Sequence, residues 1–222
     1  MSVHLHPTAP IAPDAILPGD PGRALALAQE LLTSPKMANH HRGLWGYSGE
    51  TKADGRLLTI QSTGIGGPSA AIVLSELAEL GLRRAVRVGT GTAASEAVPL
   101  GALVVADQAL GRDGTSRELA APGTVDASVE LTAALAAALP GARRGSVATV
   151  DVYYFEGARP SFGVEAYEMA TAPLFALGGR LGVEAACVLA VAAAPAGERL
   201  GEERLLEAEL AMGRAAAAAL AG

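Results

Sequence analysis

Residues 56–71 read RLLTIQSTGIGGPSAA and combine a strand, a glycine-rich loop and the start of a helix. The run RLLTIQS is β-branched or apolar on both faces, which is typical of a strand in a covered sheet. Pro68 and Ser69 then favour the first turn of a helix. Close-set glycines let backbone approach a ligand, and a helix start adds unpaired amides. We expect either an anion-binding loop or a tight turn without a ligand. A dinucleotide fingerprint is not expected, because its third glycine is missing.

The same alternation of strand and helix continues along the chain in both directions. Strand-like runs lie at 15–19, 56–62, 85–89, 102–107, 146–151 and 183–192. Helix-like segments lie at 21–32, 68–80, 126–139, 169–179 and 198–220. This alternation predicts an α/β protein. Between 111 and 124 the chain is polar, and we expect an exposed loop there.

Length and composition predict a single domain that spans residues 1–222. A chain of 222 residues buries roughly 70% of the surface that its unfolded form exposes. Of its residues 50% are apolar but only 4% are aromatic, which favours helices layered on a buried sheet over an aromatic-rich sandwich. The net charge of −6 argues against a nucleic-acid partner, because no basic stripe is available for a phosphate backbone.

Cysteine usage and the two ends of the chain indicate the compartment. Cys187 stands alone in VEAACVLAVAAA, so we expect a buried, unreactive thiol in a reducing environment. The first residues, MSVHLHPTAPIAPD, lack the basic and apolar regions of a secretory signal. Glu207, Glu209 and Arg214 interrupt the alanine-rich end, which argues against a membrane span. We expect a cytoplasmic protein that makes no contact with a membrane.

Two arginines stand where an anion would balance their charge. Arg23 falls in the first turn of the helix at 21–32, where a cation opposes the helix dipole unless it faces solvent or a bound anion. Arg87 lies inside an apolar strand, so its guanidinium must meet a carboxylate or a bound anion. Thr90 follows at the carboxyl end of that strand, where open α/β sheets bind ligands. Together these residues predict an anion site.

Several segments resemble the uridine phosphorylases of the nucleoside phosphorylase superfamily. They are ILPGDPGRA, NHHRGL, STGIGGPS, ELAELGLRRAVRVGT and YEM, and their order and spacing match that family. The likeness covers nearly the whole chain, and STGIGGPS is highly specific. The resemblance implies a three-layer α/β/α domain with a central mixed sheet, the phosphorylase/hydrolase-like fold. It also implies a homodimer or a hexamer whose subunits share active sites.

The resemblance assigns a complete site for inorganic phosphate. Its ligands are residues of one subunit and one arginine of a neighbouring subunit: Gly19, Arg23, Arg87 and Thr90, with Arg42 from the neighbour. His4 matches the histidine by which the neighbour approaches the ribose 5′-hydroxyl. The resemblance implies no metal and no cofactor, because phosphate itself is the co-substrate.

The segment DVYYFEGAR is similar to the part of the family that contacts the base. Tyr153 matches an aromatic residue that stacks on ribose and base, and Arg159 matches an arginine that reads uracil. The family's glutamine corresponds to Gly157. Glu168 and Met169 match residues beside the nucleoside. Pyrimidine preference therefore depends mainly on Arg159, which the residues alone also allow to lie on the surface.

The sugar and purine positions depart from the family. Ala170 stands where the family has a second glutamate, which grips the ribose 2′- and 3′-hydroxyls. Related purine phosphorylases protonate the base with an aspartate after a late strand, whereas residues 190–195 here read AVAAAP. The chain is also shorter by roughly twenty residues between Arg159 and Gly163, which removes part of the flap over the base.

The function that the resemblance implies is that of a pentosyltransferase similar to uridine phosphorylase. Phosphate attacks C1′ of a pyrimidine nucleoside and yields the free base and ribose or deoxyribose 1-phosphate. Arg87 and Arg159 are the catalytic candidates, one for phosphate and one for the leaving base. Two alternatives stay open: a nucleosidase, which cleaves without phosphate, and a binding protein that kept the phosphate pocket and lost turnover.

Overall fold

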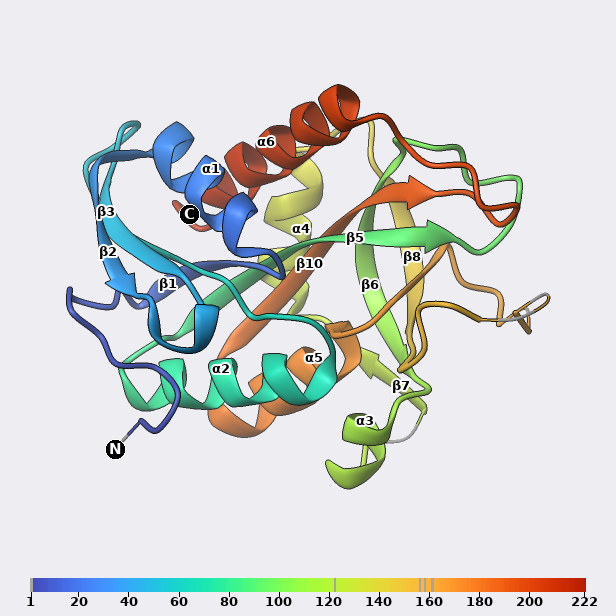
Figure 1. The fold of residues 1–222 in the computed structure, drawn as a ribbon, viewed down its shortest axis with the longest axis horizontal. Coiled ribbons are helices and arrows are strands. Elements are labelled where there is room, and N and C mark those ends of the chain that lie inside the picture. The colour runs from blue at the N-terminus through green and yellow to red at the C-terminus, as the bar shows by residue number, and fades with distance from the viewer. Residues whose placement is uncertain (1, 122, 156, 158, 161) are drawn as a thin grey trace.

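The protein folds as a mixed sheet with helices on both faces (Figure 1). The computed structural model describes residues 2–121, 123–155, 157, 159–160 and 162–222. The strands are β1 (Asp14–Pro18), β2 (Leu32–Asn39), β3 (Gly46–Thr51), β4 (Leu57–Gln61), β5 (Arg84–Ala93), β6 (Leu103–Gly111), β7 (Gly123–Asp126), β8 (Arg143–Thr149), β9 (Ala166–Glu168) and β10 (Glu184–Ala193). The helices are α1 (Pro21–Leu31), η1 (His41–Gly43), α2 (Gly67–Glu79), α3 (Gly114–Glu118), α4 (Val129–Ala137), α5 (Thr171–Leu181) and α6 (Glu202–Ala219).

Part of the sheet closes on itself. The strand order is β10-β6-β8-β9-β5-β1-β4-β3-β2, with β7 beside β6, and β10 also pairs with β5. Strands β5, β10, β6, β8 and β9 therefore form a ring, and this end of the sheet is a barrel. β10 is parallel to β5 and antiparallel to β6, so the sheet is mixed. The expected mixed α/β fold is confirmed. The closure of the five strands into a barrel was not expected, because local sequence patterns do not encode it.

The helices form one layer on each side of the sheet, as Figure 1 shows. On one side α1, α4 and α6 bury residues such as Leu27 and Met212 against Val86 of β5. On the other side α2 and α5 bury residues such as Leu74 against Leu17 of β1. Full burial of each such leucine contributes roughly 2 kcal/mol of transfer free energy, so these contacts fix both layers on the sheet.

Each strand and helix that the sequence predicts is present, with ends that move by a few residues. The prediction of an exposed loop at 111–124 was wrong, because this segment contains α3 and the start of β7. The Asp113 carboxylate accepts a hydrogen bond from the Ser116 amide at 2.9 Å and so starts α3 within polar sequence. β2 was missed because Pro35 interrupts its pattern, which an edge strand tolerates. Among the described residues, no helix is long and apolar enough to cross a membrane.

Candidate active site

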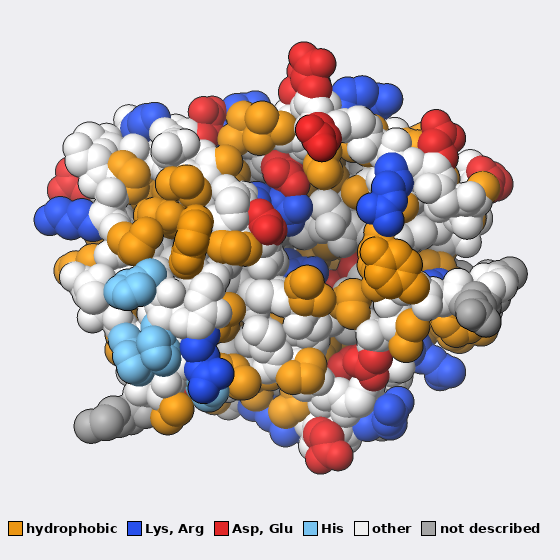
Figure 2. Space-filling view, in the orientation of Figure 1, with side chains coloured by type: hydrophobic (Ala, Val, Ile, Leu, Met, Phe, Trp, Pro, Cys, Tyr) orange, Lys and Arg blue, Asp and Glu red, His pale blue; other side chains and the backbone are white. Residues whose placement is uncertain are grey.

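A cavity of about 370 Å³ lies where several strands of the sheet end. The loops after β1 and β4, the carboxyl half of β5, the segment around β9 and the end of β10 line it. Figure 2 shows basic and acidic side chains at the centre of this face, partly covered by their neighbours. The cavity therefore occupies the place where open α/β sheets bind ligands.

Two glycine-containing loops form one wall of the cavity. A Cβ atom on Gly19, in the β1–α1 loop, would lie only 3.3 Å from the carbonyl oxygen of Gly64, in the β4–α2 loop. Gly64 and Gly66 have φ of +72° and +88°, a conformation that side chains disfavour. The Asp20 carboxylate accepts a hydrogen bond from the Arg23 amide at 2.7 Å and caps α1. The starts of α1 and α2 thus meet beside the cavity.

Arg87 of β5 has both a carboxylate partner and an unused donor. Its Nη2 lies 3.0 Å from Oε2 of Glu168, and its Nε donates to the Thr171 hydroxyl at 3.3 Å. Its Nη1 is buried and has no partner within the described structure. A Cβ atom on Gly89 would lie 3.1 Å from the Arg87 Cζ, so glycine leaves the space that the guanidinium occupies.

Both carboxylate oxygens of Glu168 accept hydrogen bonds from other groups of the protein. Besides Arg87, its carboxylate accepts from the Ala170 amide at 2.8 Å, from the Thr171 amide at 2.9 Å and from the Thr149 hydroxyl. Its side chain is 0% exposed. Glu168 lines the cavity, but its carboxylate is engaged in orienting Arg87 and the start of α5.

Arg23 is held in a similar way by a residue that sequence reasoning did not select. Its Nη2 lies 2.5 Å from Oε1 of Glu209 in α6, and its Nη1 donates to the Val88 carbonyl at 3.4 Å. Its Nε is buried without a partner in the described structure. A signal for Glu209 was present in the sequence, because it precedes Met212 by one helical turn and so faces the core side of α6.

Aromatic residues and Arg159 line the other end of the cavity. The Arg159 guanidinium lies 5.3 Å from the centre of the Tyr167 ring and donates to the backbone carbonyls of Val152 and Tyr153. The Tyr167 hydroxyl donates to the Pro160 carbonyl at 2.6 Å, and burial raises its pKa. The structure thus brings the expected base-contacting residues to the same cavity as Arg23 and Arg87.

No carboxylate occupies the positions that the resemblance matches to sugar and purine contacts, which are Ala170 and residues 190–195. Ala170 is buried in the apolar cluster that includes Leu17 and Leu174, and it does not line the cavity. Ala192 and Ala193, at the end of β10, do line it. Met169 and Thr90 also line the cavity.

His4 and Arg42 do not line the cavity of their own chain. The Nδ1 of His4 lies 2.7 Å from a Glu76 carboxylate oxygen, which also accepts from the backbone amides of Val3 and His4, while the other oxygen accepts from Leu5. Burial raises the pKa of Glu76, but these hydrogen bonds outweigh it and lower the pKa to about 2. Arg42 has a φ of +56°, which is unusual for a residue with a side chain.

Cys187 is buried in β10 and pairs in register with Arg87 of β5. Its sulfur lies 3.5 Å from the Thr171 hydroxyl. Burial raises the pKa of the thiol to about 12, although the charge of Arg87 opposes this. The thiol is therefore inert at neutral pH, which agrees with the expected role in core packing.

The sequence model of the phosphorylase superfamily matches residues 13–221, so the chain belongs to the phosphorylase superfamily, whose members are pentosyltransferases. A DeoD-type purine nucleoside phosphorylase of Alkaliphilus metalliredigens is 33% identical, in an alignment that covers 92% of this chain and 93% of that protein. A DeoD-type purine nucleoside phosphorylase of Bacillus cereus is 34% identical and covers 86% of each chain. The crystal structure of uridine phosphorylase from Vibrio fischeri matches with a TM-score of 0.83 and 25% identity, over 95% of this chain and 92% of that one.

Proposed function

We propose that the protein is a nucleoside phosphorylase, which cleaves a nucleoside with inorganic phosphate to give a free base and a pentose 1-phosphate. One observation carries this proposal: Arg23 and Arg87 both line a cavity with glycine-containing walls, and each has a buried nitrogen without a partner among the described residues. A buried donor without an acceptor is costly, and a phosphate oxygen would supply that acceptor. Membership of the phosphorylase superfamily supports the same ligand.

The mechanism follows from the order of groups along the cavity. Phosphate bound by Gly19, Arg23, Arg87 and Thr90 attacks C1′, the bond between C1′ and the base breaks, and the base leaves with the electron pair. Because Glu168 fixes Arg87 before phosphate arrives, little reorganisation is needed at the moment of attack. Arg159 then stabilises the negative charge that develops on the leaving base.

We propose a pyrimidine nucleoside, uridine or its deoxy counterpart, as the substrate. A uracil anion leaves without protonation more readily than a purine does, and Ala192 and Ala193 offer no proton donor at the end of β10. The family's ribose-binding glutamate is matched here by Ala170, which is buried and does not line the cavity. We therefore propose deoxyribose over ribose, because no acid at this position grips the 2′-hydroxyl. A purine nucleoside is the second candidate, because the relatives at 33% and 34% identity are purine nucleoside phosphorylases.

We also propose that the active protein is a homodimer or a hexamer in which Arg42 and His4 serve a neighbour's cavity. Figure 2 shows histidines gathered at one edge of the face, beside hydrophobic side chains. Val3, Met37 and Trp45, which lie close in sequence to His4, His40 and His41, are exposed apolar residues. A monomer by light scattering at micromolar concentration that still cleaves nucleosides would refute shared sites.

A cleavage screen tests the reaction. Uridine, thymidine, deoxyuridine, inosine and methylthioadenosine are incubated with and without phosphate, and the free base is measured by chromatography. We expect phosphate-dependent release of uracil, with deoxyuridine preferred over uridine. Release in the absence of phosphate would instead identify a nucleosidase, and phosphate binding without cleavage of any nucleoside would identify a binding protein. Arg214→Gln serves as the control, because Arg214 is exposed and lies in the C-terminal half of α6, outside the cavity.

A further inference from the structure

A second cavity of about 370 Å³ adjoins the candidate active site. The two cavities share Thr92, Tyr153, Arg159, Tyr167 and Ala193 as wall residues. The phosphate candidates of the β1–α1 loop and β5 line only the first cavity. The second cavity therefore continues the base end of the site, away from phosphate.

The walls of the second cavity are aromatic and cationic. Tyr154 and Phe155 line it, and the Arg159 guanidinium lies 4.8 Å from the centre of the Phe155 ring. The Arg199 guanidinium lies 5.8 Å from the centre of the Tyr153 ring. No acidic residue lines this cavity within the described part of the chain. Such walls suit a planar or anionic group.

The two arginines of the second cavity have no carboxylate partner among the described residues. Some arginines of this acidic protein pair with carboxylates, as Arg84 does with Asp14, whereas others such as Arg112 and Arg180 have no carboxylate partner among the described residues either. Arg159 donates hydrogen bonds to backbone carbonyls, so no carboxylate among the described residues neutralises its positive charge. An anion placed between these arginines would meet two positive charges and, among the described wall residues, no negative one.

Small residues form part of the wall where the two cavities adjoin. β10 ends at Ala193, which lines both cavities, and Ala194 and Gly197 follow in the segment that leads to Arg199. A base seated beside Tyr167 and Arg159 would thus direct its far edge toward Arg199. A substituent on that edge would meet aromatic and cationic wall residues and no acidic one among those described.

We propose that the second cavity binds a carboxylate-bearing substituent on the base, so that the preferred substrate is a nucleoside whose base carries an acidic group. This inference rests on the proposed phosphorylase function and narrows its substrate class. Arg199 binds the carboxylate through two parallel hydrogen bonds, while the aromatic rings contact the linking carbon. The protein's net charge of −6 does not attract such a substrate from a distance, so the local arginines carry its recognition.

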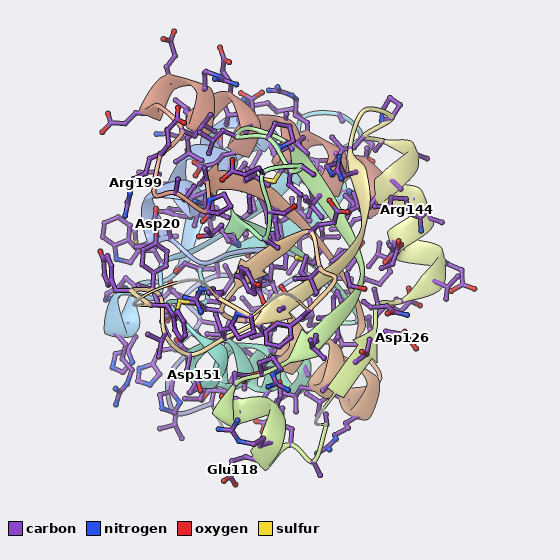
Figure 3. The ribbon with its side chains drawn as sticks, turned by 90° about the vertical axis from the view of Figure 1, so that its right-hand side faces the viewer. Asp20, Glu118, Asp126, Arg144, Asp151 and Arg199 are labelled. Atoms are coloured by element: carbon purple, nitrogen blue, oxygen red, sulfur yellow. The ribbon has the colours of Figure 1, made fainter. Side chains whose placement is uncertain are left out.

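Two matched nucleosides test the subsite: 5-carboxymethyluridine and its neutral amide, 5-carbamoylmethyluridine, which has nearly the same shape. Binding is measured by calorimetry in phosphate-free buffer, and cleavage is measured separately with phosphate. We expect the acid to bind about tenfold more tightly than the amide, and Arg199→Gln to bring the ratio of affinities to about one. Arg144→Gln, which lies at the opposite edge from Arg199 in Figure 3, keeps the wild-type ratio.

Equal affinity for acid and amide in the wild type would overturn the subsite, as would a preference that survives Arg199→Gln. These outcomes are separable from the fate of the proposed function. Preferential binding of the acid without cleavage of any nucleoside would support the subsite and count against the phosphorylase. Phosphate-dependent cleavage of uridine with no preference for the acid would support the phosphorylase and count against the subsite.

Discussion

The two ends of the candidate active site are built from different kinds of structure. The end that we propose binds phosphate, called the phosphate end below, is formed by β5 and the starts of two helices, and its Arg23 and Arg87 side chains are only 10% and 8% exposed. The base end is formed by the loop after β8, where Tyr154 is 83% exposed. Figure 3 shows Asp20 of the phosphate end and Arg199 of the base end toward the same edge of the molecule.

This difference shows how the fold divides its tasks. Phosphate is the same for every nucleoside, so its site can be fixed by buried ion pairs that need no adjustment. Bases differ among substrates, and a loop carries their contacts because it tolerates substitution and insertion better than a strand does. Substitutions at the phosphate end should therefore affect stability and catalysis together, and those at the base end should affect specificity.

The largest effect is expected for Arg87→Met. This change removes a phosphate ligand and leaves the buried Glu168 carboxylate without its cation, so we expect undetectable phosphate binding and a loss of about 3 to 5 kcal/mol of unfolding free energy. Calorimetry and urea unfolding measure the two effects. Arg144→Met, at an exposed ion pair, is the control and should change neither. Normal phosphate affinity in Arg87→Met would disprove the assigned site.

The next largest effect is expected for Glu76, whose carboxylate holds the segment that contains His4. This prediction tests whether that segment is held as firmly as the phosphate end. The folded pKa of Glu76 is lowered from 4.5 to about 2, so its contribution to stability is complete above pH 4.5 and is lost as pH falls toward 2. We expect the wild type to lose about 3 kcal/mol of unfolding free energy across that window relative to Glu76→Gln. Urea unfolding at several pH values measures this difference, and parallel curves for both proteins would contradict it.

Arg159→Gln should separate the two ends of the cavity. It removes a charged contact to the leaving base, so we expect kcat/KM for the preferred pyrimidine nucleoside to fall about tenfold to a hundredfold. The Kd for phosphate should stay the same, because Arg159 belongs to the base end. Steady-state kinetics and calorimetry provide both numbers. A change confined to phosphate affinity would show that the assignment of the two ends is wrong.

The smallest effect is expected at Glu209, which neutralises Arg23. Glu209→Gln keeps a hydrogen-bond acceptor for Arg23 but removes a negative charge near the bound anion. We expect phosphate to bind about threefold to tenfold more tightly at low salt, and less so at high salt. Glu207→Gln in the same helix is the matched control. Weaker phosphate binding in Glu209→Gln would show that the charge of Glu209 is needed to orient Arg23.

Local signals in the sequence were enough to select candidates for the end of the cavity that we propose binds phosphate. A buried arginine in an apolar strand demands a partner, and a glycine loop before a helix start is a local pattern, so Arg87 and the β4–α2 loop were both found. Glu209 was missed because its partner lies far away in the sequence and only tertiary packing brings the two together. The same reason explains why the ring of strands was not foreseen.

The base and sugar positions were harder to interpret from residue types alone. Glu168 was expected beside the nucleoside, and it does line the cavity, but its hydrogen bonds to Arg87 and to α5 depend on side-chain directions that spacing does not reveal. The burial of Ala170 among apolar residues is equally invisible in the motif YEMA. Arg199 carries no local signal, because its position opposite Tyr153 depends on how the turn after β10 folds.

The buried Cys187 gives the wild-type protein an internal reporter of strand separation. It is the chain's one cysteine, and it sits in register with Arg87 at the seam between β10 and β5. A thiol with a pKa near 12 reacts with a labelling reagent only after that seam opens, so the labelling rate measures native-state opening without any engineered probe. An anion bound to Arg87 would slow the labelling. Thiol exchange on the unmodified protein can thus detect occupancy of the phosphate end even when no nucleoside is turned over.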